Sequence, residues 1–182
     1  FKVELENFKM PEVYNAVNVM QNTAFKVNHY ILGVMQEAWD KGLALGGMPP
    51  NENLDIPNKP HDIDTNRDAR REWKKKAVIA HTENARMFSK RLLYAKILWE
   101  AEKFKAYKTI YFPLQLDFRG RAYCVPAFLN YQSISGAKAL LQFSYGKAIT
   151  EENKGDFWLA VHGANMWGKD KQSLQDRVKW VE

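Results

Sequence analysis

The sequence predicts a mainly α-helical protein with a small β element, an α+β fold. Apolar residues recur every three or four positions through residues 11–41 and 66–105, which indicates amphipathic helices. Only two short stretches, 107–112 and 122–125, favour strands by their aromatic and β-branched residues. With 46% hydrophobic and 13% aromatic residues, the 182-residue chain has the composition of a folded protein with one sizeable core.

The first long helix is expected over residues 11–41. Pro11 suits the first helical position, and Glu12 complements the positive end of the helix dipole. Apolar residues follow in alternating steps of four and three, which places them in one stripe for core packing. The stripe consists of Val13, Val17, Met20, Ala24, Val27, Ile31, Val34 and Ala38. Gly42 is expected to end this helix.

An irregular surface linker is expected over residues 42–64. Four of the seven prolines and three of the ten glycines fall in this stretch. Proline removes a backbone donor and glycine disfavours regular structure, so neither a helix nor a strand is expected there. A linker of this length indicates a function, mobility or both.

A second long helix is expected to begin at residues 65–68, which resemble a capping box with Asp in place of the usual Glu. It should continue to about Lys105, with residues 81–84 as the place for any interruption. One face is apolar and consists of Phe88, Leu92, Ala95 and Trp99. Residues 66–108 hold 13 basic and five acidic residues, a net charge of +8 against +6 for the whole chain. Such a field is typical of a protein that binds a polyanion, and a solvated helix face is the alternative.

Shorter elements are expected after residue 106. Residues 107–112 and 122–125 should pair as a hairpin across an Arg-Gly-Arg turn. The helices predicted beyond it cover residues 137–145, residues from Thr150 through 157–166 up to Gly168, and residues from about Ser173 onward.

The sequence carries no self-contained catalytic or metal site. It lacks the common phosphate-loop, nucleophile-elbow, zinc-protease and dinucleotide-binding motifs. The four histidines are scattered, and no pair of carboxylates suggests the two-metal site that nucleotide transfer needs. Cys124 is the single cysteine, which excludes an internal disulfide and suits a reducing compartment. No apolar run approaches the roughly 18 residues of a membrane span.

The most informative segment is Asp117-Phe118-Arg119-Gly120-Arg121. The planar arginine fork offers paired N–H donors and is well suited to phosphate. Glycine lets the backbone turn tightly or approach a ligand closely, and a carboxylate two residues from Arg119 can fix an arginine in one orientation. The pattern indicates a rigid phosphate-gripping turn beside a strand, and a structural ion pair around a turn is the alternative.

Residues Tyr111–Pro126, which contain this turn, resemble the DxxGR motif block of the single-subunit DNA-directed RNA polymerases of bacteriophages and mitochondria. Three other segments resemble parts of the same family in the same order. They are Pro11–Asn28 with a QNTAWK-type signature, Gly136–Gly146, and the HGAN sequence at Val161–Asn165. The resemblance extends from about Phe8 to Glu182. Phe25 and Phe118 stand where many phage members have tryptophan, so both positions keep an aromatic ring.

The resemblance implies a long-helix thumb followed by the first part of a polymerase palm. Residues 1–29 would end the N-terminal region, residues 30–105 would form the thumb with the linker at 42–64, and residues 106–182 would begin the palm. The chain would be an excerpt, inactive alone, of a longer enzyme whose catalytic residues and Mg²⁺ ligands lie outside it. The implied partners are a DNA template, an RNA–DNA hybrid and nucleoside triphosphates, for a monomer without membrane attachment. A phage enzyme would act in the cytoplasm of an infected bacterium, and an organellar one in the mitochondrial matrix.

Matching positions imply roles for individual residues. Asp117, Gly120 and Arg121 match the fixed letters of DxxGR, and Arg119 matches an arginine common at its variable position. Contact with the template and hybrid backbone is implied for this group, with Asp117 orienting an arginine, and Tyr123 matches an aromatic position near the template base. The basic residues matched to nucleic-acid contacts are Lys90, Arg91 and Lys138, and the one matched to the nucleotide triphosphate is Lys171. For these four, ordinary solvated surface cations are the alternative.

Two other functions remain open from the sequence. The chain could be a stand-alone helical nucleic-acid-binding module without catalysis, or a structural interaction protein with an incidental basic face. Only the first of these predicts a salt-dependent affinity for an RNA–DNA hybrid.

Overall fold

The computed structural model describes residues 9–182, which divide into two compact units, with the boundary in the chain between Ser144 and Tyr145. The first eight residues of the predicted N-terminal region, including Phe8, lie outside the described residues. The predicted α+β class is confirmed, since helices dominate and the strands are short. In the part of the chain that the structure describes, no helix has the length and apolarity to cross a lipid bilayer.

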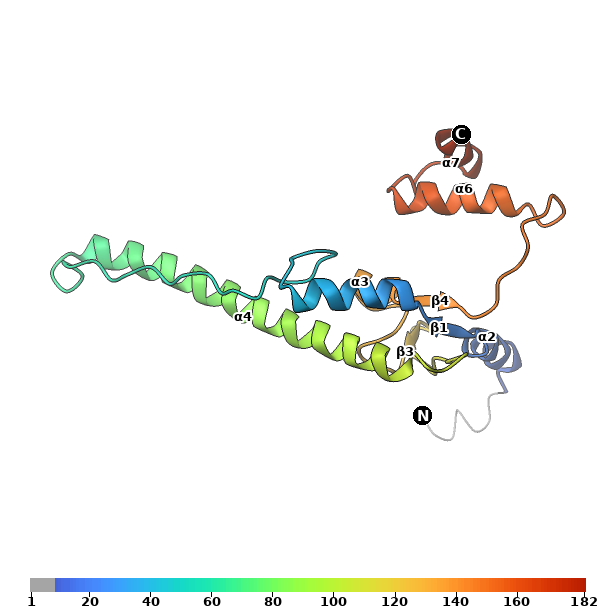
Figure 1. The fold of residues 1–182 in the computed structure, drawn as a ribbon, viewed down its shortest axis with the longest axis horizontal. Coiled ribbons are helices and arrows are strands. Elements are labelled where there is room, and N and C mark those ends of the chain that lie inside the picture. Colours follow the sequence, from blue (N-terminus) through green and yellow to red (C-terminus); the bar gives the residue numbers. More distant parts are fainter. Residues whose placement is uncertain (1–8) are drawn as a thin grey trace. The chain divides into compact units, whose positions relative to one another are not determined.

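The single helix predicted over residues 11–41 is wrong, because a strand divides it. Helix α2 spans Pro11–Gln21, strand β1 spans Phe25–Val27 and helix α3 spans His29–Asp40. β1 pairs antiparallel with β4, Leu141–Phe143 (Figure 1). The sequence did not indicate this division, because the helical spacing of apolar residues continues through residues 25–27. The strand that pairs with β1 lies more than a hundred residues away in the sequence.

Helix α3 has its own start signal in Asn28. The Asn28 side chain accepts a hydrogen bond from the Ile31 N–H at 3.2 Å, which is the usual N-cap contact. The Asn28 backbone N–H donates to the carbonyl of Leu140 at 2.8 Å and extends the pairing of β1 with β4. As predicted, the helix ends before Gly42, whose φ of +68° is the left-handed conformation favoured there.

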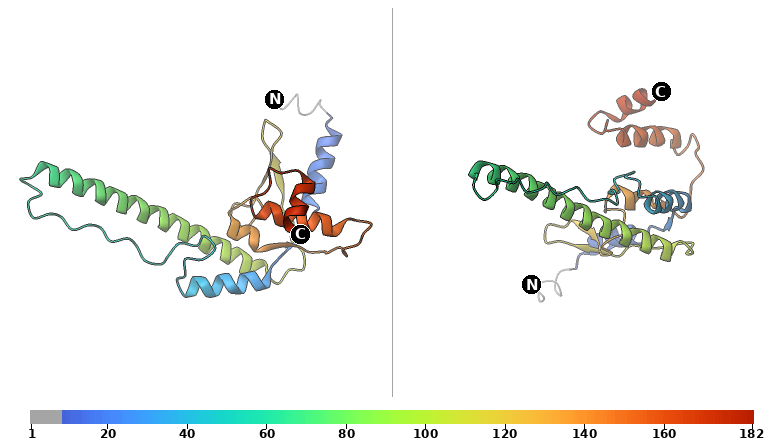
Figure 2. Two further views of the ribbon diagram at one scale, coloured as in Figure 1. Left: turned by 90° about the horizontal axis from the view of Figure 1, so that it is seen from above. Right: turned by 60° about the vertical axis from the view of Figure 1, so that its left-hand side comes forward.

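Helix α4, Arg67–Phe104, is continuous, so the interruption considered at residues 81–84 is absent. Its N-cap is Asn66, whose side chain accepts from the N–H groups of Asp68 and Ala69 at 3.1 Å. Residues 42–64 are irregular, as predicted, and run alongside α4 from the end of α3 to the start of α4 (Figure 2).

The apolar face predicted on α4 lies in solvent, with Phe88, Leu92 and Trp99 between 53% and 60% exposed. The face of α4 that is buried carries Ala77, Ala80, Tyr94, Ile97, Leu98 and Ala101. Tertiary packing decides which face of α4 is buried, because α3 and the linker lie against the face that carries Tyr94.

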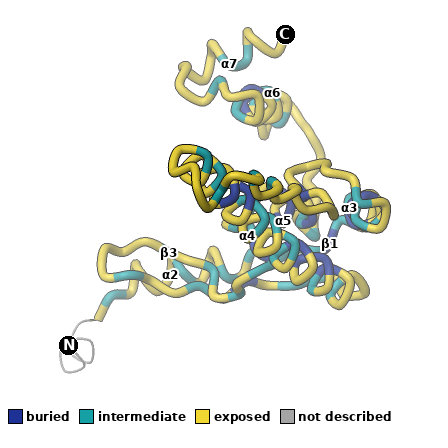
Figure 3. The backbone as a smooth tube through the Cα atoms, turned by 90° about the vertical axis from the view of Figure 1, so that its left-hand side faces the viewer, coloured by how far each residue is buried: buried dark blue, intermediate teal, exposed yellow. Residues whose placement is uncertain are grey.

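The core of the first unit lies where α3, α4, β1 and a short helix α5, Ser135–Ala139, meet (Figure 3). Ile97 and Leu140 are fully buried there. Gly136 allows α5 to approach α4 closely, since a Cβ at this position would lie 2.9 Å from the Tyr94 ring. The helix predicted over residues 137–145 is wrong. Helix α5 ends at Ala139, and the residues that follow form strand β4, which pairs with β1.

The predicted hairpin is present, but its first strand is displaced. Strand β2 spans Leu114–Leu116 and pairs with β3, Ala122–Cys124. Residues 107–112 form only an isolated bridge, between Ile110 and Phe25. Their apolar composition serves packing instead, with Phe112 only 5% exposed.

The second unit contains helix α6, Gly155–Met166, and helix α7, Leu174–Val181. The predicted helix start at Thr150 is wrong, because Thr150 and Asn153 bond each other in a separate turn: each side chain accepts the other residue's backbone N–H, at 3.2 and 3.3 Å. Gly168 ends α6 with a φ of +87°, and Ser173 caps α7 by accepting the Asp176 N–H, both as predicted.

Candidate nucleic-acid interface

The candidate site is the turn between β2 and β3, residues 117–121, called the arginine turn below. Pairing of Gln115 with Tyr123 and of Leu116 with Ala122 brings the two strands together at its base. The Asp117 N–H donates to the Arg121 carbonyl at 2.9 Å, and the Gly120 N–H donates to the Asp117 carbonyl at 3.0 Å. Gly120 has a φ of +76°, which favours glycine and explains its place in the motif.

The Asp117 carboxylate organises the turn. Its Oδ1 accepts the backbone N–H groups of Arg119 and Arg121, both at 2.9 Å. Its Oδ2 accepts from Arg119 Nε and Nη2 at 3.3 and 3.2 Å and from the Tyr123 hydroxyl at 3.5 Å. The Arg121 N–H, the Arg119 groups and the Tyr123 hydroxyl all favour the charged form and hold the pKa of Asp117 below its ordinary value, although partial burial opposes them.

The two arginines of the turn have different surroundings. Arg119 is paired with Asp117, and its guanidinium carbon lies 5.4 Å from the centre of the Phe118 ring. Arg121 is exposed, and its guanidinium forms no hydrogen bond or ion pair with any residue between 9 and 182. Phe118 is 91% exposed at the tip. The turn therefore presents an unpaired guanidinium beside an exposed aromatic ring.

Two glutamine side chains outside the hairpin hold it in place. Gln21 Oε1 accepts the Leu114 N–H at 2.8 Å. Gln132 bridges β3, accepting the Cys124 N–H at 2.7 Å and donating to the Ala122 carbonyl at 2.9 Å.

An aromatic cluster lies behind the hairpin. The Phe25 ring stacks on Tyr131 at 5.3 Å and meets Phe112 edge-on at 5.4 Å. Burial, with a smaller effect from Cys124, raises the pKa of Tyr131 to about 12. The QNTA-type segment thus contributes Gln21 to the hairpin and Phe25 to the aromatic cluster.

The matched basic pair on α4 is divided between two roles. Lys90 is exposed and lines an open pocket with Tyr94 and Ile134. Arg91 is half-buried and faces the linker, where Nε donates to the Pro50 carbonyl, Nη1 to Asn53 Oδ1 and Nη2 to the Glu52 carbonyl, at 2.7 to 2.8 Å. The Arg91 guanidinium therefore holds the linker against α4.

The other two matched lysines lie in separate units. Lys138 is an exposed residue of α5. Lys171 is 90% exposed in the connection between α6 and α7, with its ammonium 3.2 Å from Asp170. Among residues 9–182, no three His, Cys, Asp or Glu side chains come together to hold a metal ion.

Comparison with known proteins supports the polymerase resemblance. The chain is 42% identical over 179 residues to the DNA-directed RNA polymerase of Enterobacteria phage T3 and 39% identical to T7 RNA polymerase of Escherichia phage T7, in each case over 97% of this chain. The mitochondrial DNA-directed RNA polymerase of Neurospora crassa is 33% identical over 95% of this chain. A family model described as DNA-dependent RNA polymerase matches residues 150–182.

Over nearly its whole length the chain is similar to single-subunit RNA polymerases of phages and mitochondria. It spans about a fifth of the length of the two phage relatives, 20% in each, and 12% of the mitochondrial one. The residue roles and the thumb and palm boundaries inferred from the polymerase resemblance stay predictions.

Three residues of the site were not among the predicted contacts. Phe118 was noted only as an aromatic replacement, yet it is the most exposed aromatic ring among the described residues. Gln21 and Gln132 fix the hairpin through backbone groups, which lie 93 residues from Gln21 and 8 and 10 residues from Gln132. The QNTA signature was a signal for Gln21, whereas nothing in the local sequence marked Gln132.

Proposed function

We propose that this chain is part of a DNA-directed RNA polymerase, an enzyme that synthesises RNA on a DNA template. We propose further that its arginine turn grips the backbone of the template strand and of the RNA–DNA hybrid. The observation that carries the grip is Arg121, an exposed guanidinium without a partner among residues 9–182, on a turn that Asp117 fixes from within. The names of the relatives support the polymerase assignment.

A fixed turn suits this task because a phosphate contact is stronger when the donor loses little conformational freedom on binding. Asp117 accepts both flanking backbone N–H groups, so the Arg121 backbone is in place before any ligand arrives. The exposed Phe118 ring adds a surface on which a base can stack. Backbone contacts do not depend on sequence, which a processive polymerase requires.

The wider assignments belong to the same proposal. Residues 30–105 act as the thumb, where the basic residues of α4, including Lys90, face the hybrid, and residues 106–182 begin the palm. Lys138 contacts the nucleic acid and Lys171 the nucleotide triphosphate. Residues 9–182 contain no cluster of His, Cys, Asp or Glu for a metal ion, so no step of nucleotide transfer is assigned to this segment; in the proposed enzyme, Mg²⁺ is bound by other parts. The enzyme acts as a monomer, in the cytoplasm of an infected bacterium or in a mitochondrion.

A hybrid titration tests the grip. A fluorescently labelled RNA–DNA hybrid is titrated with the 182-residue chain at several salt concentrations, using wild type, Arg121→Gln and the control Lys147→Gln, which removes an exposed charge from the second unit. Arg121→Gln should weaken binding and lower the slope of log affinity against log salt by about 1 more than the control. Equal slopes for the two variants would remove Arg121 from the interface.

The polymerase assignment needs a separate test in the complete enzyme. Arg121→Gln there should reduce full-length RNA synthesis and increase short abortive products, because the hybrid is held less firmly. If the wild-type enzyme makes no RNA on a DNA template in the presence of Mg²⁺, the assignment is wrong.

A further inference from the structure

A second basic site lies on the first unit, at the side of β1 that faces away from the aromatic cluster. Phe25 packs among aromatic rings and Val27 lies in the core, so the alternation of the strand turns Lys26 to the opposite face. Gln142 is the partner of Lys26 in the β1–β4 register and projects to the same face. In Figure 1 this place lies where β1 and β4 approach the start of α3.

An open pocket of about 450 Å³ occupies this place. Three segments meet in it: β1 with the start of α3, the chain that follows α4, and β4. The lining residues that could contact a ligand are Lys26, Tyr30, Lys105, Tyr107, Lys108 and Gln142. The lining therefore contains three lysines and two tyrosines and no carboxylate. A hydrogen bond of 2.8 Å between His29 Nε2 and the Lys105 carbonyl ties two of the segments together.

The charges of the pocket are not all compensated. Lys105 forms an ion pair with Glu102, a neighbouring carboxylate that also accepts a hydrogen bond from Gln36 at 2.9 Å. Lys26 and Lys108 form no ion pair with any residue between 9 and 182, and Lys26 is half-buried. The ammonium groups of Lys26 and Lys108 are therefore available to an anion bound in the pocket.

The rim of the pocket is aromatic. Tyr30 is 78% exposed and Tyr107 is 58% exposed. Lysines in a concave site combined with exposed aromatic rings are the combination that single-stranded nucleic acids require, since phosphates bind the cations and base faces stack on the rings. A duplex buries its base faces, so it could use the lysines but not the tyrosines.

We propose that this pocket binds a single nucleic-acid strand, with Lys26 and Lys108 holding phosphates and the rings of Tyr30 and Tyr107 stacking on the adjoining bases. The site is separate from the arginine turn, because Lys26 and Phe25 project from opposite faces of β1. The inference rests on the proposed function only in naming nucleic acid as the source of the phosphate. An enzyme that opens a duplex and releases a transcript has unpaired strands for such a site to hold.

The test is fluorescence anisotropy of a labelled short oligothymidine with the 182-residue chain over a series of salt concentrations. Lys26→Gln/Lys108→Gln should lower the slope of log affinity against log salt by about 1.4, which is about 0.7 for each of two lost phosphate contacts on a single strand. The matched control Lys147→Gln/Lys179→Gln removes the same charge from the second unit and should leave the slope near wild type. Tyr30→Leu/Tyr107→Leu should weaken binding roughly tenfold or more without changing the slope.

Further arms separate the possible outcomes. Lys26→Arg keeps the charge and should keep the wild-type slope, which shows that the slope depends on the charge at this position. Inorganic phosphate at matched ionic strength should not displace the oligonucleotide, and displacement by it would make the pocket a free-phosphate site and overturn the proposal. A lysine variant with the same slope as its control would also overturn it. The Arg121→Gln titration with hybrid decides the proposed function independently, so either site can fail while the other stands.

Discussion

Replacing Arg91 with lysine should release the linker from α4 without removing a charge. The three hydrogen bonds from Arg91 to Pro50, Glu52 and Asn53 depend on the planar fork of the guanidinium, because its donors point in fixed directions. A lysine ammonium can keep one of them at most. At a half-buried position, the loss of about two hydrogen bonds should amount to about 1–2 kcal/mol, which raises the population of the open linker about 5- to 30-fold.

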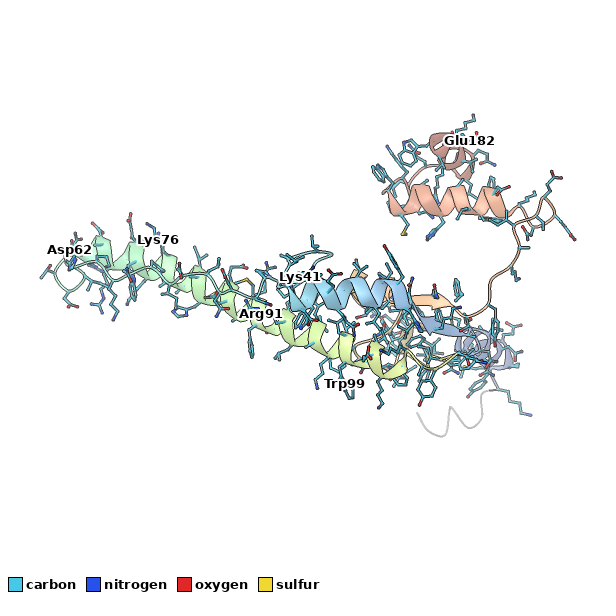
Figure 4. All side chains as sticks on the ribbon, in the orientation of Figure 1. Lys41, Asp62, Lys76, Arg91, Trp99 and Glu182 are labelled. Carbon is cyan, nitrogen blue, oxygen red and sulfur yellow. The ribbon has the colours of Figure 1, made fainter. Side chains whose placement is uncertain are left out.

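Hydrogen exchange measures this opening directly. In the wild type, the Leu54 N–H donates to Asn84 Oδ1 at 2.7 Å and the Met48 N–H donates to the Leu45 carbonyl at 2.9 Å, so peptides covering residues 45–56 should show protection. Arg91→Lys should speed their exchange by the factor given above. Figure 4 shows Arg91 on α4. The control is Arg86→Lys on the same helix, because among residues 9–182 Arg86 bonds Glu83 alone, at 3.0 Å. Unchanged exchange in Arg91→Lys would show that the guanidinium does not hold the linker.

Two further predictions concern the arginine turn and the core. The folded-state pKa of Asp117 is lowered, so the stabilisation that its carboxylate gives the turn should be present above the ordinary carboxyl pKa and lost as pH falls through the lowered value. NMR titration of the backbone amides of Arg119 and Arg121 should follow this loss. The variant Asp117→Asn should abolish the transition. Ile97→Ala should destabilise the chain by about 2–5 kcal/mol in urea unfolding, because Ile97 is 0% exposed, whereas Ile79→Ala, at 63% exposed on the same helix, should change stability by less than about 0.5 kcal/mol. An Ile97→Ala midpoint equal to that of Ile79→Ala would contradict the placement of the core.

Local signals in the sequence determined several of the helix ends and the arginine turn. Asn66, Ser173, Gly42 and Gly168 act within a few residues of themselves, through a side-chain cap or a left-handed φ, so their effect does not depend on the rest of the fold. The Asp-x-x-Gly-Arg turn is local for the same reason. Asp117 reaches the N–H groups of Arg119 and Arg121 within its own loop, which is why a rigid turn was predictable from these five residues, whereas its contact with phosphate stays a prediction.

The tertiary structure decided where strands form and which surfaces are buried. Residues 25–27 continue a helical pattern and residues 141–143 were expected in a helix, yet each becomes a strand because the other provides the pairing edge. α4 buries Tyr94 and Ile97 and leaves Phe88 and Trp99 in solvent, because its packing partners lie on one side only. The sequence identifies Arg91 and Lys26 only as basic residues. The fold bonds Arg91 to the linker and places Lys26 in a pocket whose lining contains no carboxylate. Contacts between residues distant in the sequence depend on the whole packed unit, and no local pattern encodes them.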